Sequence, residues 1–99
     1  MLIVTGVITM HPESADAFRK AALVAMAETE KEEGCVTYRF WEDIGRPGVF
    51  RIYEEWESDA HLKAHFGTAH IAAFRGAMAT FRDVSRKVVI IENFTRRSL

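Results

Sequence analysis

The sequence has almost no cysteine, and its single thiol is Cys35. One cysteine cannot form an internal disulfide, and it cannot alone build a zinc site, which needs several Cys or His ligands. A disulfide-stapled scaffold is therefore excluded, and we expect Cys35 to be buried as a small apolar side chain.

The chain also lacks a long hydrophobic run, a basic leader and an excess of charge of one sign. A membrane span needs about 18 or more consecutive apolar residues, and the N-terminus carries neither a basic lead nor a small-residue cleavage site. The formal net charge of −1, with both signs interleaved, gives no long-range attraction for phosphate backbones. We therefore expect a cytoplasmic protein with neither a membrane nor a nucleic acid as partner.

The composition that remains is that of a globular domain. Hydrophobic residues make up 48% of the 99 residues and charged residues 27%, which is too apolar for a disordered chain. The length fits one domain, and we expect it to span residues 1–99.

The first third of the chain predicts a strand followed by a helix. Residues 2–10 are rich in Ile, Val and Thr, and His11-Pro12 then ends the strand. Ser14 is the expected N-cap of a helix that Gly34 stops. The acidic run from Glu28 to Glu33 is interpreted as a solvated helix end without a function. The apolar helix face is expected to contain Phe18, Ala22 and Ala25.

The rest of the chain predicts a hairpin, two helices and a last strand. Two aromatic-rich strands are expected at residues 35–43 and 49–57, joined by a Gly and Pro loop. Ser58 and Thr68 are expected to cap two successive helices, the first ending near Phe66. The last strand is expected at residues 83–94. It carries apolar side chains on both faces, and both faces must therefore be covered. The second of the two helices carries an apolar stripe along one side. The stripe consists of Ile71, Phe74, Met78 and Phe81.

This order of elements predicts an α+β protein with the ferredoxin-like β-α-β-β-α-β fold. Such a fold has one four-stranded antiparallel sheet with helices on one face only. Large apolar groups alternate along the hairpin, so that both faces of the sheet carry them. Because an open apolar face of this size is unusual in a monomer, we expect a homodimer in which two sheets pack face to face.

The stretch from Gly34 to Phe74 holds most of the residues that could carry chemistry. It includes three of the four histidines and both tryptophans. His61 and His65 are four residues apart, which is a spacing of metal pairs on a helix. No Asp, Glu or Cys is expected to converge on them, so no metal site is predicted.

The motifs in this stretch resemble one known family. Glu33-Gly34-Cys35 with Tyr38, then Tyr53-Glu-Glu-Trp-Glu-Ser58, Ala60-His61-Leu62, His65, Thr68 and His70 are similar to the antibiotic biosynthesis monooxygenase (ABM) domain family. The resemblance covers essentially the whole chain and is closest to the quinol-monooxygenase branch. It implies a dimeric α/β barrel with a pocket in each protomer between the sheet and its helices.

The resemblance also implies a set of possible activities. Some members oxidise quinols or polyketide phenols with O2 and without metal, flavin or haem, whereas others degrade haem or isomerise a small phosphorylated sugar derivative. The polyketide branch has an asparagine where this sequence has Ile52, and a tyrosine where it has Leu62. The haem-degrading branch has a tryptophan near His65 and a haem-ligating histidine near Arg75, so haem degradation is not expected.

His65 is the first candidate for a catalytic group, because an imidazole can take a phenolic proton near neutral pH. Equally, His65 could be a structural residue whose ring N–H donates a hydrogen bond to a backbone carbonyl. His70 follows the break at Gly67, and it faces either a loop or the mouth of the pocket. Trp56 is assigned with these two histidines as a candidate catalytic or positioning group. Glu54 alternates onto the same sheet face as Trp56, where a structural role is expected.

The substrate is expected to be a small aromatic molecule held by a lining of aromatic side chains. The candidate substrate-binding residues are Tyr38, Phe40, Phe50 and His61. The leading hypothesis is a cofactor-independent monooxygenase that oxidises a small quinol or polyphenol with O2. The alternatives are a dimer that binds a small metabolite without turnover, or an isomerase on the same fold.

Overall fold

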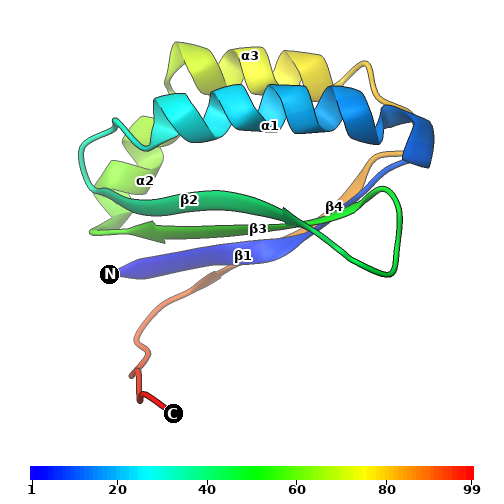
Figure 1. The fold of residues 1–99 in the computed structure, drawn as a ribbon. Coiled ribbons are helices and arrows are strands. Elements are labelled where there is room, and N and C mark those ends of the chain that lie inside the picture. Colours follow the sequence, from blue (N-terminus) through cyan, green and yellow to red (C-terminus); the bar gives the residue numbers. More distant parts are fainter.

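A computed structural model describes all 99 residues. Its elements follow the predicted order, with two helices after the hairpin (Figure 1). The strands and helices are β1 Leu2–Thr9, the short 3-10 helix η1 Pro12–Ser14, α1 Ala15–Thr29, β2 Cys35–Glu42, β3 Val49–Trp56, α2 Asp59–Phe66, α3 Ala69–Met78 and β4 Ser85–Ile91.

The four strands form one antiparallel sheet in the order β2-β3-β1-β4. The helices α1 and α3 lie side by side over one face of this sheet, and no helix covers the other face (Figure 1). The ferredoxin-like prediction is therefore confirmed. The helix α2 lies below the end of α1 beside the sheet (Figure 1), and its Leu62 packs in the buried cluster between the two layers.

Alternate strand residues build the core between the layers. Val4, Ile52 and Trp56 point toward the helices and pack with residues of α1 in one buried cluster. Phe18 is wholly buried in a second cluster, where its ring centroid lies 4.4 Å from that of Phe50. The alternation read from the hairpin is confirmed, because it places these residues on the covered face.

The N-cap position of α1 is confirmed at Ser14, but its capping bond and the C-terminal end of the helix differ from the prediction. Ser14 precedes the helix, but its side chain makes no capping bond and instead accepts a hydrogen bond from the backbone N–H of Arg82. The helix ends at Thr29, five positions before Gly34. The prediction was wrong here because a glycine with positive φ marks a turn, and this turn belongs to the entry into β2 rather than to the helix end.

The last strand is shorter than predicted and its apolar run is not covered. It ends at Ile91, and residues 83 and 93 on either side of it have positive φ. Val88 packs against the core, whereas Val89 is 58% exposed and lies on the open face with the 54% exposed Trp41. Within one chain, this face of the sheet therefore carries exposed apolar side chains.

The chain contains no helix with the length and hydrophobicity needed to cross a bilayer.

Replacing Gly34 by alanine is expected to destabilise the fold. Gly34 has φ +79°, and a Cβ there would overlap the His61 ring. We expect a loss of about 1–3 kcal/mol in the free energy of unfolding, because the variant combines backbone strain with a displaced ring. The matched control is Gly76→Ala, whose Cβ meets no atom within 4 Å on α3; it should stabilise by about 0.5–1 kcal/mol. Urea denaturation measures both, and equal stabilities would contradict the prediction.

Candidate active site

A cavity lies between the sheet and the two helices α2 and α3. Its wall is mainly hydrophobic, with rings from β2, α2 and α3, and it carries four charged or titratable polar side chains as well as the Tyr38 hydroxyl. The lining consists of Ile8, Tyr38, Phe40, Ile52, Glu54, His65, Phe66, Ile71, Phe74, Arg75, Met78 and Arg86. An apolar cavity with a few convergent polar groups is the usual form of a small-molecule site.

His65 reaches this cavity from α2. Ser58 caps that helix by accepting a hydrogen bond from the backbone N–H of His61, as predicted, and this fixes where α2 begins. The His65 side chain is 3% exposed, and its ring centroid lies 4.8 Å from that of Trp56 and 5.4 Å from that of Tyr38. The imidazole is therefore held between two aromatic rings.

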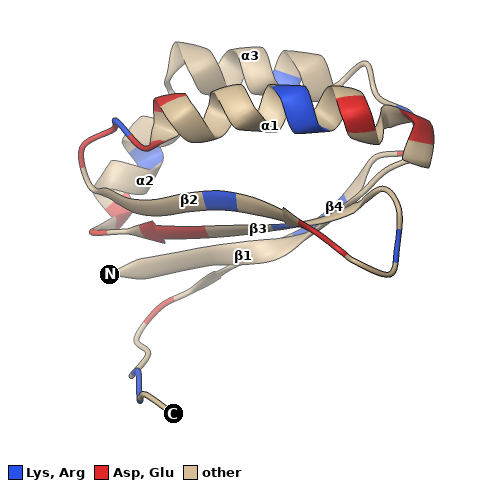
Figure 2. Ribbon diagram, viewed as in Figure 1, with Lys and Arg blue, Asp and Glu red and all other residues tan.

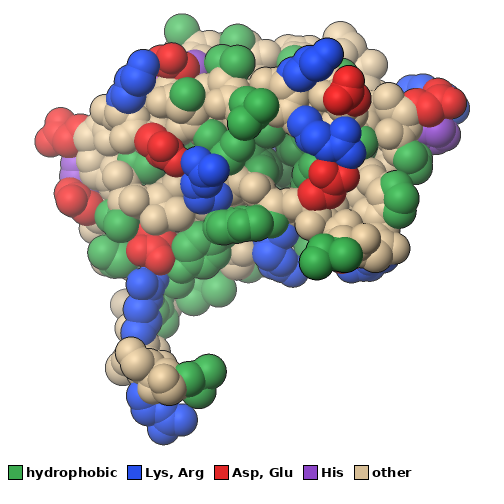
Figure 3. All heavy atoms as spheres, in the orientation of Figure 1, with side chains coloured by type: hydrophobic (Ala, Val, Ile, Leu, Met, Phe, Trp, Pro, Cys, Tyr) green, Lys and Arg blue, Asp and Glu red, His purple; other side chains and the backbone are tan.

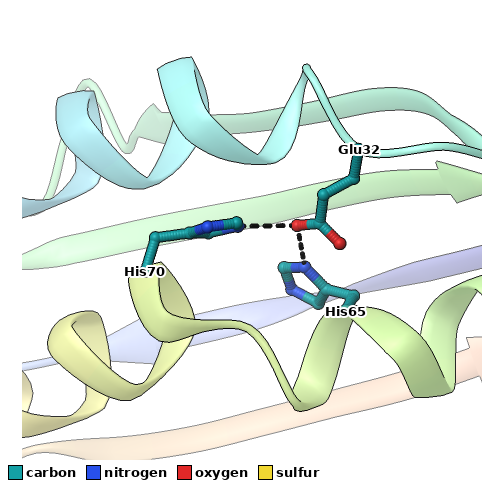
Figure 4. Close-up of side chains that lie close together, drawn as sticks. All are labelled: Glu32, His65 and His70. Carbon is teal, nitrogen blue, oxygen red and sulfur yellow. Dashed lines mark hydrogen bonds and ion pairs between the residues drawn. The ribbon is translucent and has the colours of Figure 1, made fainter.

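Glu32 anchors this imidazole, which corrects the interpretation of the acidic run as a solvated helix end. The chain leaves α1 after Thr29, and the loop that follows turns the Glu32 side chain inward to 14% exposure. Its Oε2 lies 2.7 Å from Nδ1 of His65 and 2.7 Å from Nε2 of His70 (Figure 4). One carboxylate oxygen thus links the α1–β2 loop, α2 and α3.

The shared oxygen fixes the roles of the ring nitrogens. A carboxylate only accepts hydrogen bonds, so Nδ1 of His65 and Nε2 of His70 are the donors. Nε2 of His65 then keeps a lone pair that can take a proton. Burial lowers the pKa of His65 below its usual value, and the hydrogen bond to Glu32 opposes this shift. His65 is therefore oriented and mainly neutral at neutral pH, so Nε2 could accept a proton.

Glu54 is a second acid–base group on the cavity wall. Its Oε1 accepts a hydrogen bond of 2.8 Å from the indole N–H of Trp56. Burial raises the pKa of the Glu54 carboxyl from 4.5 to about 7, although the bond from Trp56 and the charge of Arg86 act in the other direction. Glu54 can therefore exchange a proton near neutral pH.

Tyr38 faces the same cavity, and its phenol makes no hydrogen bond within the chain. Burial raises the pKa of Tyr38, so its hydroxyl stays protonated and can donate a hydrogen bond to a bound molecule.

The other candidate residues lie around the cavity rather than in it. Trp56 is fully buried behind His65 and Glu54. His70 opens onto the groove between α1 and α3. His61 bonds Ser58 through Nδ1 and covers Gly34, so it does not share a site with His65.

Phe50 belongs to a different hollow from the one that His65 lines. That hollow lies between α1 and β2, where Figure 3 shows hydrophobic side chains gathered between charged ones. Of the aromatic residues expected to bind substrate, Phe40 and Tyr38 line the His65 cavity and Phe50 does not.

Glu32, His65 and His70 are also the group that could hold a metal ion, since their ligand atoms lie within 4.8 Å of one another. The expectation that no carboxylate converges on the histidines was wrong. A tetrahedral zinc with bonds of 2.0–2.2 Å would set its ligand atoms about 3.3 Å apart. The two N···O distances of 2.7 Å are those of hydrogen bonds instead. The absence of a metal from the reaction stays a prediction.

Sequence reasoning missed Glu32 and the two arginines of the lining. Nothing near Glu32 distinguishes it from the other acids around it, which Figure 2 shows at the end of α1 and in the loop that follows. Arg86 could have been found, because strand alternation puts it on the same face as Val88. Arg75 follows Phe74 on the helix and gives no such signal.

Replacing Glu54 by glutamine is expected to make stability less dependent on pH. The folded-state pKa of about 7 lies above the usual 4.5, so the stability that Glu54 contributes is complete below about pH 4.5 and is lost as the pH rises through 7. We expect little difference from the wild type at pH 5 and a gain on the order of 2–3 kcal/mol at pH 8. Urea denaturation at the two pH values measures the difference in the free energy of unfolding between Glu54→Gln and the wild type. Glu57→Gln, at an exposed position, is the control, and an E54Q gain that is no larger at pH 8 would contradict the assignment.

The comparisons with known proteins agree with this architecture. The family model described as antibiotic biosynthesis monooxygenase matches residues 1–77. A Bacillus subtilis protein named "Putative monooxygenase YcnE" is 30% identical over 74 residues, which are 75% of this chain and 78% of that protein.

Solved structures share the fold over nearly the whole chain. The crystal structure of a putative antibiotic biosynthesis monooxygenase from Deinococcus radiodurans has a TM-score of 0.90 at 24% identity, covering 100% of this chain and 98% of that one. PA3566 from Pseudomonas aeruginosa has a TM-score of 0.82 at 28% identity, covering 95% and 94%. The family match and these names support a monooxygenase-like function in general terms. The chain belongs to the antibiotic biosynthesis monooxygenase family.

Proposed function

We propose that this protein is a cofactor-independent monooxygenase that oxidises a small quinol or polyphenol with O2. The observation that carries the proposal is the His65 imidazole, which Glu32 orients at the wall of an aromatic cavity. A base held in its neutral form, next to a cavity lined by aromatic rings, is what removal of a phenolic proton requires.

The proposed reaction begins when Nε2 of His65 takes the phenolic proton. The phenolate passes one electron to O2, which gives an aryloxyl radical and superoxide. These two combine at a ring carbon that carries hydrogen, and the peroxide accepts the proton back from His65. Loss of the carbon-bound hydrogen and cleavage of the O–O bond then release water and leave a carbonyl. One quinol and one O2 thus give one hydroxyquinone and one water.

The cavity supports these steps through its lining. Phe40 and Phe74 provide apolar surface for the ring of the substrate, and an apolar wall keeps water away from the radical pair. The Tyr38 hydroxyl is a donor for negative charge that develops on oxygen. Trp56 holds Glu54 and backs the His65 ring, so it acts as a positioning residue.

Oxygen uptake tests the proposal. Purified, chelator-treated protein is mixed with reduced naphthoquinols and catechols, and uptake is corrected for autoxidation. We expect enzyme-dependent uptake with a stoichiometry of one O2 per quinol and no loss of rate after chelation. The absence of uptake above background across the panel would overturn the monooxygenase assignment and would favour a dimer that binds a metabolite without turnover. Loss of uptake after chelation, restored by a metal, would overturn cofactor independence.

A second candidate function is the isomerisation of a small metabolite. It is favoured by one observation, namely that His65 and Glu54 are two proton-exchanging groups on one cavity. Such a pair could remove a proton from one atom and return one to another. Exchange of solvent deuterium into a bound carbonyl compound, without O2 uptake, would identify this activity.

We also propose that the protein forms a homodimer through the open face of the sheet. Trp41 and Val89 are more than half exposed there, and Ile91 adds to the same surface. Packing two such faces together removes this apolar area from water.

The variant Val89→Asp is expected to weaken the dimer about 30-fold or more, because it places a charge in an apolar contact. The control is Val24→Asp, at a similarly exposed position of α1 on the helix side of the protein. Sedimentation velocity over a concentration series measures both. A wild-type protein that stays monomeric at the highest concentrations, or equal effects of the two variants, would contradict the proposed interface.

A further inference from the structure

Two arginines of the cavity wall have no acidic partner. Arg75 projects from α3 and Arg86 from β4, and neither has a carboxylate oxygen within 4.0 Å. Other arginines of the chain are neutralised by nearby acids; these are Arg19, Arg39, Arg46, Arg82 and Arg96. The only acid on the cavity wall is Glu54, so the lining carries more positive than negative charge.

The two guanidinium groups line the cavity from different elements and affect different titratable groups. The charge of Arg75 acts on His65, and its guanidinium carbon lies 5.5 Å from the centroid of the Phe66 ring. The charge of Arg86 acts on Tyr38 and on Glu54. One cation is therefore associated with the base, and the other with the phenol and carboxyl groups.

The surroundings of Arg86 are suited to an anion. The Tyr38 hydroxyl has no partner within the chain and can donate a hydrogen bond into the cavity. Burial raises the pKa of Glu54 to about 7, so about half of this carboxyl is protonated at pH 7 and its average negative charge near Arg86 is reduced. Arg86 is exposed where it lines the cavity, so its guanidinium group is accessible to a ligand, and such a group binds a carboxylate through two parallel hydrogen bonds.

We propose that the cavity takes an aromatic acid, that is, a phenol or quinol that also carries a carboxylate, with the carboxylate on Arg86 and Tyr38 and the hydroxyl facing His65. This inference rests on the proposed function, because it names the substrate class of the same cavity. Arg75, next to His65, then stabilises the phenolate that forms when the base takes the proton.

Binding of matched probes tests the proposal without turnover. Calorimetry under anaerobic conditions compares 6-hydroxy-2-naphthoate with 2-naphthol, which lacks only the carboxylate. We expect the wild type to bind the acid about tenfold or more tightly. In Arg86→Gln the ratio of the two affinities should fall to about one. In Lys87→Gln, which removes the same charge from the next residue on the opposite face of β4, the ratio should stay at the wild-type value.

Three results would overturn the proposal. These are equal affinities in the wild type, a preference for the acid that persists in Arg86→Gln, and a clearly tighter binding of 2-naphthyl phosphate, which would replace the carboxylate by a phosphate. The result of this binding test can be distinguished from the result of the oxygen-uptake test of the proposed function. Oxygen uptake with neutral quinols and no preference for acids would overturn only this inference, whereas a preference for acids without any oxygen uptake would overturn only the monooxygenase.

Discussion

Replacing His65 by asparagine should lower kcat/KM for oxygen uptake by about 10²–10⁴-fold, the usual contribution of a general base. Asparagine is preferable to alanine because its amide nitrogen can take the place of Nδ1 and still donate to Glu32. The buried site then keeps its hydrogen bond, and only the proton acceptor at Nε2 is lost. Circular dichroism and thermal melting show whether the fold is retained.

The control for this variant is His61→Ala, one helical turn earlier on α2. His61 bonds Ser58 and lies outside the cavity, so its removal should leave kcat/KM within about threefold of the wild type, with any cost confined to stability. If His65→Asn retained wild-type turnover in a folded protein, His65 would not be the base.

The role of Glu32 can be separated from a structural one by the pH profile of Glu32→Gln. The carboxylate favours protonated His65, whereas burial disfavours it. Without the carboxylate, burial is less opposed, and the acidic limb of kcat/KM should move to lower pH while the plateau falls. A variant that loses rate with an unmoved limb would make Glu32 a structural residue only.

The largest effect on stability is expected at Trp56, which is 0% exposed. Trp56→Ala should lower the free energy of unfolding by about 3–5 kcal/mol, because it opens a cavity in the core and removes the donor to Glu54. In a domain of this size, that corresponds to a fall in Tm of at least about 12 °C. Differential scanning calorimetry measures it.

Two further variants separate packing from hydrogen bonding at this position. Trp56→Phe keeps much of the ring volume but removes the N–H group, so its loss should be smaller and should grow with pH as Glu54 ionises. Ile44→Ala, in the exposed hairpin loop, is the control and should change stability by less than about 0.5 kcal/mol. A Trp56→Ala loss no larger than that of Ile44→Ala would contradict the assigned burial.

The fold could be predicted from the sequence because its signals are local. Strand alternation, the Gly and Pro loop and the capping residues Ser58 and Thr68 each act within a few residues, and together they allow one order of elements. The last strand was predicted too long, and the helix stop assigned to Gly34 was wrong because this glycine packs under the His61 ring in the entry to β2. Ser14 stands at the predicted N-cap position, but its hydroxyl accepts a bond from the distant Arg82 instead of capping the helix.

The candidate site was only partly predictable because its pairings are not local. The sequence singled out His65 and Tyr38, since their residue types are informative by themselves. Glu32 is separated from His65 by 33 positions and from His70 by 38, and the sequence near an acidic run does not say which carboxylate turns inward. Glu54 was placed on the correct face, but its unusual proton affinity comes from burial, which only the packed structure shows.

The single Glu32 oxygen shared by two histidines also makes the orientation of His65 depend on three separate segments of the chain. The loop after α1, the helix α2 and the helix α3 must all be docked before His65 is oriented. A chain in which any one of these segments has opened still offers aromatic surface to a quinol, but it has no aligned base with which to make the oxygen-reactive phenolate. The proposed chemistry is thereby restricted to the intact molecule, and partly unfolded copies would not release superoxide into the surrounding solution.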